Sequence, residues 1–363
     1  METTGDAALP LNLHEYEAAA RSILPEASFE YIAGGAADEV TLRANRAAFA
    51  RWRLLPRVLR GLSEATTATS VLGQEIALPV LVAPSGRHRL SHDQGELATA
   101  RATKNAGTIC VISTASTYPI EEVAREAGPW WFQLYVYRDR GLTRDLVERA
   151  VAAGAAALVV TVDVPQRGRR EAEARRQFAM PAGVTTAHLA APTDSGAATA
   201  AAEINAVFEP ALSWDDLDWL ASLSPLPILL KGILDPSDAV RAVEFGCRAI
   251  LVSNHGGRQL DQAPAAIDAL PAVVAAVGDR AEVLIDGGIR RGTDVLIALA
   301  LGARAVMIGR SVHWGLAVGG EAGVRHVLEL LRSEVERDLL LCGAGSPAEV
   351  DRALVVPVGP LAR

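Results

Sequence analysis

Eight short apolar runs, each ending in polar or glycine residues, constrain the fold of this chain more than any other feature. Each run is rich in Val, Ile and Leu, and amphipathic segments such as 143–153 and 236–245 separate most of them. The runs span 77–85, 108–116, 130–136, 157–163, 227–233, 249–256, 282–288 and 305–310. Near-continuous apolar strands that alternate with helices are typical of a parallel sheet buried on both faces.

Eight such units predict a closed (β/α)₈ barrel of the α/β class. A doubly wound open sheet is the alternative, but no GxGxxG motif follows an early strand. The 363 residues suffice for one large core, so we expect a single domain over 1–363 with its barrel at about 77–330. An N-terminal helical segment is expected over 12–60, and its first helix is predicted over 12–36, where two glycines end it.

The stretch 181–210 interrupts this alternation. It is rich in Ala, Thr and Gly, carries little charge and follows the fourth predicted strand. A loop of this length inside a compact domain is usually a lid or a disordered segment. Because substrates bind at the carboxyl ends of barrel strands, we interpret it as a mobile lid, with a passive insertion as the alternative.

Charge and composition argue against several classes of protein. The formal net charge is −8 and the isoelectric point is near 5.5, so no broad basic face for nucleic acid is expected. Three widely spaced cysteines, Cys110, Cys247 and Cys342, predict buried free thiols rather than disulfides or a zinc site. The N-terminus does not resemble a signal peptide, and no long uncharged apolar stretch predicts a membrane span. We therefore expect a cytoplasmic protein without a metal.

Polar residues end five of the predicted strands, which is unusual for a purely structural barrel. In chain order these ends carry Thr161 and Asp163, then Lys231, the segment SNHGGRQLD at 253–261, Asp286, and Gly309 with Arg310. The carboxyl ends of barrel strands converge on one pocket. We therefore predict that these side chains meet there.

The last two strand ends predict a cradle for an anion. The segment DGGIRRG at 286–292 has two glycines where the backbone can approach a ligand, and IGR follows at 308–310. Backbone N–H groups and the guanidinium of Arg290 or Arg310 suit a phosphate, and barrels often bind phosphate after strands seven and eight. On its own this pattern also fits a sugar-phosphate isomerase, and glycines that only make tight turns are the simpler alternative.

The segment SNHGGRQLD contains the most specific chemistry. His255 can accept a proton near neutral pH, and Arg258 can hold a carboxylate with two hydrogen bonds. The two residues lie three apart in a glycine-rich turn, whose backbone freedom lets both side chains face the pocket. With Asp163 on a neighbouring wall, its carboxylate would favour the charged imidazole and fix the orientation of the ring.

These residues lie in motifs that resemble the FMN-dependent L-2-hydroxy acid oxidase and dehydrogenase family, which includes glycolate oxidase, lactate oxidase and mandelate dehydrogenase. The resemblance runs from about residue 13 to residue 344 and rests on EYIAGGA, RVLRG, GELATARA, WFQLYVY, TVDVPQRGRRE, LPILLKGI, VSNHGGRQLD, DGGIRRGTDV and LGARAVMIGR. It implies a (β/α)₈ barrel that binds FMN and oxidises an L-2-hydroxy acid to the 2-oxo acid. It also implies reoxidation by oxygen or another acceptor, and a homo-oligomer, either a tetramer or an octamer.

The resemblance implies catalytic roles for four residues. His255 resembles the base that removes the hydroxyl proton or the Cα proton of the substrate, and Asp163 resembles its partner. Tyr135 resembles the tyrosine that hydrogen-bonds the reacting substrate. Lys231 resembles the lysine beside the flavin, where its positive charge stabilises the reduced, anionic ring.

The resemblance also implies a set of binding residues. Arg170 and Arg258 resemble the clamp for the substrate carboxylate, which the hydroxyl of Tyr31 assists. The implied FMN contacts come from Pro84, Ser85, Gly86, Ser113, Gln133, Thr161, Lys231 and Ser253, and from Asp286, Gly288, Arg290, Gly309 and Arg310 at the ribityl chain and phosphate.

Some positions depart from the family pattern. Ala115 stands where glycolate-using members have a tryptophan, so mandelate-like or other bulky acids are predicted to outperform glycolate and L-lactate. Gly86 stands where many oxidases have an alanine beside the flavin, which leaves the choice between oxygen and another acceptor open. His88 and Arg89 are unusual and are interpreted as part of a solvated loop, and His313 is expected only to repack the eighth unit.

Three alternatives stay open on the sequence. A family member that acts on an aromatic or carrier-tethered biosynthetic intermediate would keep the same residues and differ only in its substrate. Another FMN barrel, such as the isomerase that acts on isopentenyl diphosphate, would not need the clamp of Arg170 and Arg258. A flavin-binding protein without catalysis would not need His255, Asp163 and Tyr135.

Overall fold

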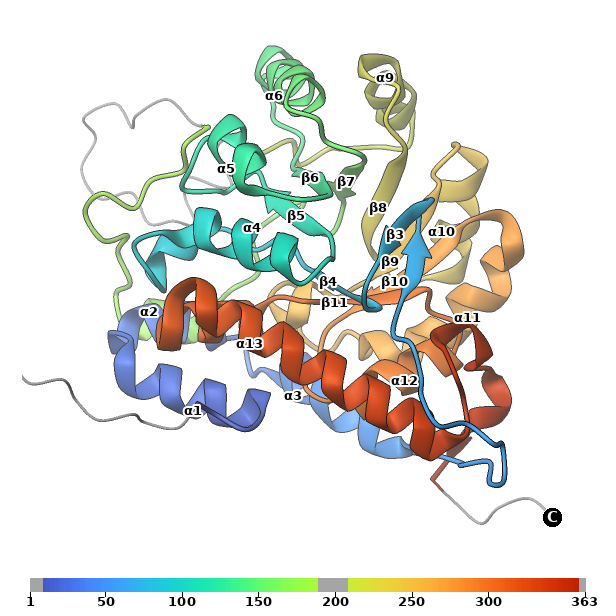
Figure 1. The fold of residues 1–363 in the computed structure, drawn as a ribbon. Coiled ribbons are helices and arrows are strands. Elements are labelled where there is room, and N and C mark those ends of the chain that lie inside the picture. The colour runs from blue at the N-terminus through green and yellow to red at the C-terminus, as the bar shows by residue number, and fades with distance from the viewer. Residues whose placement is uncertain (1–8, 189–207, 359–363) are drawn as a thin grey trace, which may run out of the picture.

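Eight parallel strands close into a barrel in the computed structural model, which describes residues 9–188 and 208–358 (Figure 1). They are β4 (Val80–Val82), β5 (Cys110–Ser113), β6 (Trp130–Leu134), β7 (Leu158–Thr161), β8 (Ile228–Ile233), β9 (Ala249–Val252), β10 (Glu282–Asp286) and β11 (Ala305–Ile308). Each lies in one of the predicted apolar runs, and β11 pairs with β4 to complete the ring. The predicted (β/α)₈ barrel is confirmed, and the open sheet is excluded.

Alternating side chains of the barrel strands enter two separate apolar clusters. Leu81, Trp131 and Leu251 belong to the cluster inside the barrel. Their chain neighbours Val82 and Phe132 belong to the larger cluster between the strands and the helices. Successive side chains of a strand point to opposite faces, and both faces are buried here, so the strands need apolar residues at nearly every position.

Helices surround the barrel and connect most of its strands. They are α4 (Gly95–Asn105), α5 (Ile120–Glu126), α6 (Arg140–Ala152), α7 (Glu171–Arg175), α9 (Asp215–Leu223), α10 (Pro236–Glu244), α11 (Ala266–Val277), α12 (Gly292–Ala300) and α13 (Arg310–Cys342). Asp139 and Asp235 begin α6 and α10, because their carboxylates accept hydrogen bonds from N–H groups of the first turn. None of the helices in the described ranges is long and apolar enough to cross a membrane.

The N-terminal segment differs from the predicted single helix over 12–36. It forms α1 (Leu13–Ile23) and α2 (Glu26–Ala33), separated at Pro25. Proline lacks the N–H that would continue the helix, and its ring clashes with the preceding turn. The interruption lets α1 lie against α13 (Figure 1), while α2 stacks Phe29 on Trp314 with ring centroids 4.8 Å apart.

The helical part of the N-terminal segment also ends earlier than the predicted residue 60. After α3 (Val40–Ala47) a short 3₁₀ turn ends at Arg51, and β1 (Trp52–Leu54) follows. This strand pairs antiparallel with β12 (Val355–Pro357) near the other end of the described chain. The last helix of the barrel, α13, reaches Cys342 rather than about residue 330.

A hairpin closes the end of the barrel at which the strands begin. It consists of β2 (Thr69–Val71) and β3 (Gln74–Ile76), and its residues Val71 and Ile76 join the cluster inside the barrel. At its turn, the N–H of Leu72 donates to the Glu282 carboxylate at 2.9 Å, and Glu282 is the first residue of β10. The carboxyl ends of the strands therefore provide the open end of the barrel.

Most of the predicted lid, 181–210, lies outside the described residues, which resume at Phe208. The two described flanks contact the carboxyl ends of the strands. The N–H of Ala187 donates to the carbonyl of Ser116 at 2.9 Å, after β5. Phe208 stacks on Tyr135, just after β6, with ring centroids 4.5 Å apart. The segment therefore leaves and rejoins the barrel beside the predicted pocket.

Candidate active site

One cavity at the carboxyl ends of the strands contains most of the predicted site residues. Those that line it are Tyr31, Pro84, Ser85, Gly86, Ser113, Ala115, Tyr135, Arg170, Lys231, His255, Arg258, Asp286, Gly288, Arg290, Gly309 and Arg310. The others lie behind its wall, where they hydrogen-bond to lining residues or to one another; they are Gln133, Thr161, Asp163 and Ser253. The predicted convergence of strand ends on one pocket is therefore observed.

His255 is oriented by a carboxylate on a neighbouring strand end. Its Nδ1 lies 2.9 Å from Oδ1 of Asp163, and its Nε2 lies 3.4 Å from the hydroxyl of Tyr135. A carboxylate accepts hydrogen bonds, so the neutral ring carries its proton on Nδ1 and leaves Nε2 as the acceptor. The geometry therefore presents a base to the cavity.

The close approach of Asp163 to β8 depends on a glycine. The register of β8 against β9 shifts between Lys231 and Ile233. Gly232 lies within this irregularity with φ of 107°, and a Cβ there would stand 2.6 Å from the Cβ of Asp163. Position 232 therefore requires a glycine. Glycine adopts this positive φ without strain, and its missing Cβ leaves room for the side chain of Asp163.

The charges of His255 and Asp163 follow from burial and from each other. Burial lowers the pKa of His255 below its usual value, although the Asp163 carboxylate acts in the opposite direction. Burial acts to raise the pKa of Asp163, but its interactions with His255 and with the Lys231 ammonium outweigh burial and lower that pKa. Near neutral pH the pair is therefore a neutral imidazole beside an ionised carboxylate, which is ready to accept a proton.

Lys231 connects His255, through Ser253, to Asp286 at the end of β10. Its Nζ donates to Oγ of Ser253 at 2.9 Å and lies 3.3 Å from Oδ2 of Asp286. The same Ser253 oxygen accepts the N–H of His255 at 3.0 Å. Oδ1 of Asp286 is buried and has no hydrogen-bond partner among the described residues. A buried carboxylate oxygen in this situation needs a donor from a ligand or water.

The ends of β5, β6 and β7 are joined by a chain of side-chain hydrogen bonds. Ser113 Oγ donates to Gln133 Oε1 at 2.9 Å, and Gln133 Nε2 donates to Thr161 Oγ1 at 3.1 Å. Only Ser113 of these lines the cavity itself. Three of the FMN contacts implied by the resemblance are therefore joined to one another, and Gln133 and Thr161 lie behind the wall.

The residues predicted to cradle a phosphate line the cavity, and they also hold the fold together. Gly288 has φ of 86°, and a Cβ there would lie 2.1 Å from the carbonyl oxygen of Asn45 on α3. The Arg310 guanidinium donates to the carbonyls of Ile32, Gly34 and Gly256, each at 3.0 Å. Gly288 thus makes a tight turn, as the simpler alternative proposed. Gly288, Arg290 and Arg310 also line the cavity, so the same residues remain available to an anion.

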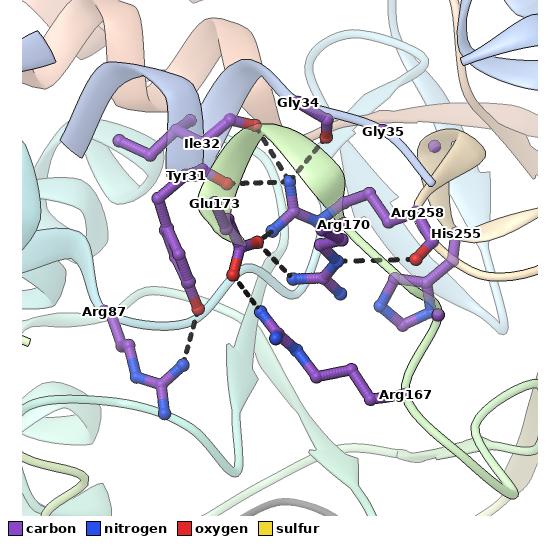
Figure 2. A network of polar contacts seen from close by, with 12 residues as sticks. Tyr31, Ile32, Gly34, Gly35, Arg87, Arg167, Arg170, Glu173, His255 and Arg258 are labelled. Carbon is purple, nitrogen blue, oxygen red and sulfur yellow. Dashed lines mark hydrogen bonds and ion pairs between the residues drawn. The ribbon is translucent and has the colours of Figure 1, made fainter. Parts of the chain in front are cut away.

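Arg170 and Arg258, which the resemblance implies as a carboxylate clamp, lie in one polar network with Tyr31 (Figure 2). Arg258 Nη1 donates to the carbonyls of Tyr31 and Gly34, both at 2.9 Å. Arg170 Nε donates to the carbonyl of Arg258 at 3.4 Å, and Arg170 Nη1 donates to Glu173 Oε1 at 3.2 Å. The loop that follows α2 and the turn that contains His255 are therefore fixed together at the clamp.

The sequence prediction missed three members of this network: Arg87, Arg167 and Glu173. Glu173 Oε2 accepts from Arg167, and the Tyr31 hydroxyl accepts from an Arg87 nitrogen. Arg87 and Arg167 both line the cavity. The sequence did contain a signal for these residues. The segments SGRHR and QRGRREAE are densely charged and adjoin residues already assigned to the pocket.

The interpretation of His88 and Arg89 as a solvated loop was wrong. His88 is only 3% exposed, and its ring nitrogens bond to Thr99 at 2.9 Å and to Ser85 at 2.8 Å. Arg89 donates to the carbonyl of Gly183 at 2.8 Å. His313 does more than repack the eighth unit, because it lines the cavity and its ring centroid lies 4.6 Å from that of His88.

Comparison with known proteins places the chain in a family. Residues 20–357 match the model of the FMN-dependent dehydrogenases. L-lactate oxidase of Nostoc sp. is 52% identical over 360 residues, covering 95% of this chain and 98% of that protein. The peroxisomal (S)-2-hydroxy-acid oxidase of Oryza sativa subsp. japonica is 48% identical, with 97% of each chain covered. A crystal structure of mandelate oxidase with (S)-4-hydroxymandelic acid has a TM-score of 0.91 and 46% identity, covering 94% of this chain and 98% of that chain. The chain therefore belongs to the FMN-dependent dehydrogenase family.

The residues present fit FMN, the cofactor of this family. Asp286 offers a buried oxygen that needs a donor, as a ribityl hydroxyl would supply. Arg290 offers a guanidinium for the phosphate, and Lys231 offers a buried ammonium for the polar edge of the ring. Ser113 supplies a hydroxyl on the opposite wall.

We predict that Arg290→Gln lowers affinity for FMN by about 10- to 100-fold while affinity for riboflavin changes much less. A charged hydrogen bond to the phosphate is lost, and riboflavin has no phosphate. Fluorescence titration of the flavin-free protein with both flavins measures the ratio. Arg291→Gln is the matched control, because Arg291 pairs with Glu334 at 2.8 Å instead. An equal loss for both flavins would remove Arg290 from the phosphate site.

Proposed function

We propose that this protein oxidises an L-2-hydroxy acid to the 2-oxo acid with FMN, and that His255 is the proton acceptor. One observation supports this most strongly. His255 lines the same cavity as Arg170 and Arg258, while Asp163 Oδ1 lies 2.9 Å from its Nδ1 and leaves Nε2 as the acceptor. A base beside a carboxylate clamp is what a 2-hydroxy acid requires.

Each side chain has a distinct role in this proposal. Arg170 and Arg258 bind the substrate carboxylate and so place the neighbouring Cα and hydroxyl near His255. His255 accepts the hydroxyl proton or the Cα proton, and Asp163 stabilises the imidazolium that results. Tyr135, 3.4 Å from His255 Nε2, hydrogen-bonds the reacting oxygen. The Lys231 ammonium stabilises negative charge that develops in the site.

The electron balance requires the cofactor. When bound, FMN supplies the two-electron oxidant. The substrate loses its hydroxyl hydrogen and its Cα hydrogen together with two electrons, and its C–O single bond becomes the C=O bond of the oxo acid. Oxygen or another acceptor then removes the electrons. The names of the relatives, L-lactate oxidase and (S)-2-hydroxy-acid oxidase, support oxygen as that acceptor.

The substrate in this proposal is bulky, as in a mandelate-like acid. The support comes from the wall of the cavity, where the small residue Ala115 stands in the place of the tryptophan of glycolate-using members. The similarity to a mandelate oxidase structure points the same way. A family member that acts on a bulky biosynthetic intermediate fits the same wall.

The proposal extends to the compartment and the assembly. We assign the protein to the cytoplasm, because its three cysteines are free and buried, as expected in a reducing compartment. A relative named as peroxisomal makes that organelle the alternative. The family resemblance supports a homo-oligomer of four or eight chains, which light scattering of the purified protein would measure.

We predict that His255→Ala slows flavin reduction by at least about 100-fold, the usual scale for a general base. The native kcat/KM should be constant near neutral pH and fall in acid, because a protonated His255 cannot accept a proton. Since burial lowers the pKa of His255, the midpoint of this fall should lie below pH 6.5.

Asp163→Asn sharpens the same test. It removes the charge that raises the pKa of His255, so the acid fall should move to still lower pH while the rate also drops. His14→Ala, on α1 and not among the described residues that line the cavity, is the control and should leave the profile unchanged. A His255→Ala enzyme that reduces its flavin at the native rate would show that another group is the base.

We predict that the native enzyme prefers (S)-mandelate to L-lactate, and that Ala115→Trp reverses the order. An indole at this position fills space that would otherwise bury a phenyl ring, which contributes roughly 2–3 kcal/mol. The kcat/KM values of both acids, measured in both enzymes, give the answer. A native preference for lactate, or mandelate use that the tryptophan leaves unchanged, would show that Ala115 does not set the size of the pocket.

A further inference from the structure

We infer that Phe208 is a positioning residue for the oxidation: its ring fixes the ring of Tyr135 and so sets where the Tyr135 hydroxyl stands relative to His255. This inference rests on the proposed function, since it takes His255 as the base and Tyr135 as the donor to the reacting oxygen. A phenyl ring has no hydrogen-bonding group, so the effect of Phe208 is assigned to the ring on which it packs.

The hydroxyl of Tyr135 is not fixed by its hydrogen bonds. Among the described residues its one hydrogen-bond partner is His255, whose Nε2 lies 3.4 Å away, whereas most protein hydrogen bonds span about 2.7–3.2 Å. The backbone is anchored, because the N–H of Tyr135 donates to Oγ1 of Thr114 at 3.1 Å. The ring can still turn about the two torsions of its side chain. The position of the hydroxyl therefore depends on what the ring packs against.

Phe208 supplies that packing. The rings of Phe208 and Tyr135 stack with centroids 4.5 Å apart and planes 25° apart. Stacked aromatic rings at this separation attract each other beyond the burial of their apolar surface. A second cavity, of about 40 Å³, is lined by both residues, so the surroundings leave free space beside the stack. Loss of the Phe208 ring would enlarge that space and let Tyr135 move.

Phe208 is itself held in place by the residues that follow β6. Its backbone forms an antiparallel bridge with Tyr137, and its carbonyl accepts from Nε of Arg138 at 3.1 Å. The N–H of the next residue, Glu209, donates to the carbonyl of Val136 at 2.9 Å. The buried ring of Tyr137 meets Phe208 edge-on, with centroids 5.3 Å apart. Phe208 is thus attached to the same strand end as the ring that it orients.

The position of the Tyr135 hydroxyl matters because it is a hydrogen-bond donor beside the base. Burial and the Asp163 carboxylate raise the pKa of Tyr135, so the hydroxyl keeps its proton. A ring turned closer to His255 would donate fully to Nε2 and occupy the lone pair that accepts the substrate proton. A ring turned away would lose the reacting oxygen. The stack on Phe208 restricts both movements, and a misplacement of about 1 Å can lower a rate by about 100-fold.

A direct contact with the substrate is the competing role for Phe208, because this residue also lines the main cavity. The two roles leave different kinetic signatures. A substrate contact changes affinity by an amount that depends on the substrate side chain, whereas a positioning role changes the reduction step for small and large acids alike. L-Lactate and (S)-mandelate therefore serve as a matched pair of substrates.

The test is anaerobic stopped-flow mixing of the FMN-loaded enzyme with each acid, which gives the limiting rate constant of flavin reduction and the apparent Kd. We expect Phe208→Leu to lower the limiting rate by about 10- to 100-fold with both acids, while the apparent Kd changes by less than about 2-fold. Phe208→Tyr keeps the ring and should retain most of the rate. Phe208→Met, which has no ring but packs adaptably, should match Phe208→Leu and replaces it if that variant does not fold.

A double-mutant cycle shows whether Phe208 acts through Tyr135. Tyr135→Phe keeps the ring but removes the hydroxyl, so no donor is left to position. In that background, Phe208→Leu should lower the reduction rate by less than about 2-fold. Phe245→Leu is the matched control, because it removes a ring that stacks on Trp214 with centroids 5.8 Å apart. Neither Phe245 nor Trp214 is among the described residues that line the cavity, so the rate should stay unchanged.

The outcomes separate this inference from the proposed function. Native reduction rates in both Phe208→Leu and Phe208→Met would overturn the inference and leave the proposed function intact. An equal loss with and without the Tyr135 hydroxyl, or a loss of affinity alone that differs between the two acids, would also overturn it. No flavin reduction of the native enzyme by either acid would contradict the proposed function itself.

Discussion

The hydrogen bond between His255 and Asp163 is the contact on which the rest of the site depends. It joins the end of β9 to the residues after β7 across the bulge of β8, where Gly232 leaves room for the carboxylate. Through Ser253 and Lys231 the same arrangement reaches Asp286 at the end of β10. One chain of polar contacts thus fixes His255, the proposed base, relative to the residues that fit the cofactor.

The open end of the barrel is completed by a segment from outside it. Arg258 and Arg310 donate to backbone carbonyls of the turn after α2, and Asn45 of α3 lies against Gly288. Guanidinium groups therefore hold the N-terminal helices over the cavity while also lining it. Because these contacts are buried and charged, we expect a substitution at Arg258 to alter both the lining of the cavity and the position of α2.

Much of this structure could be predicted from the sequence, because its signals are local. The eight strands follow from apolar runs, and His255, Lys231 and Asp286 follow from polar residues at strand ends. Pro25 was present in the sequence as a helix breaker but was outweighed by apolar periodicity. Arg87 and Glu173 could not be placed, because their burial depends on how the α2 turn and the segment after β7 pack, which no local pattern encodes.

The most direct measurement is anaerobic mixing of the FMN-loaded protein with an L-2-hydroxy acid, its methyl ester and its D enantiomer while the flavin absorbance is recorded. If His255 is the base and Arg170 and Arg258 bind the carboxylate, as proposed, the L acid should bleach the flavin at least about 100-fold faster than the ester or the D acid. Equal bleaching by the acid and its ester would contradict the clamp, and an unchanged spectrum with every acid would contradict the oxidation itself.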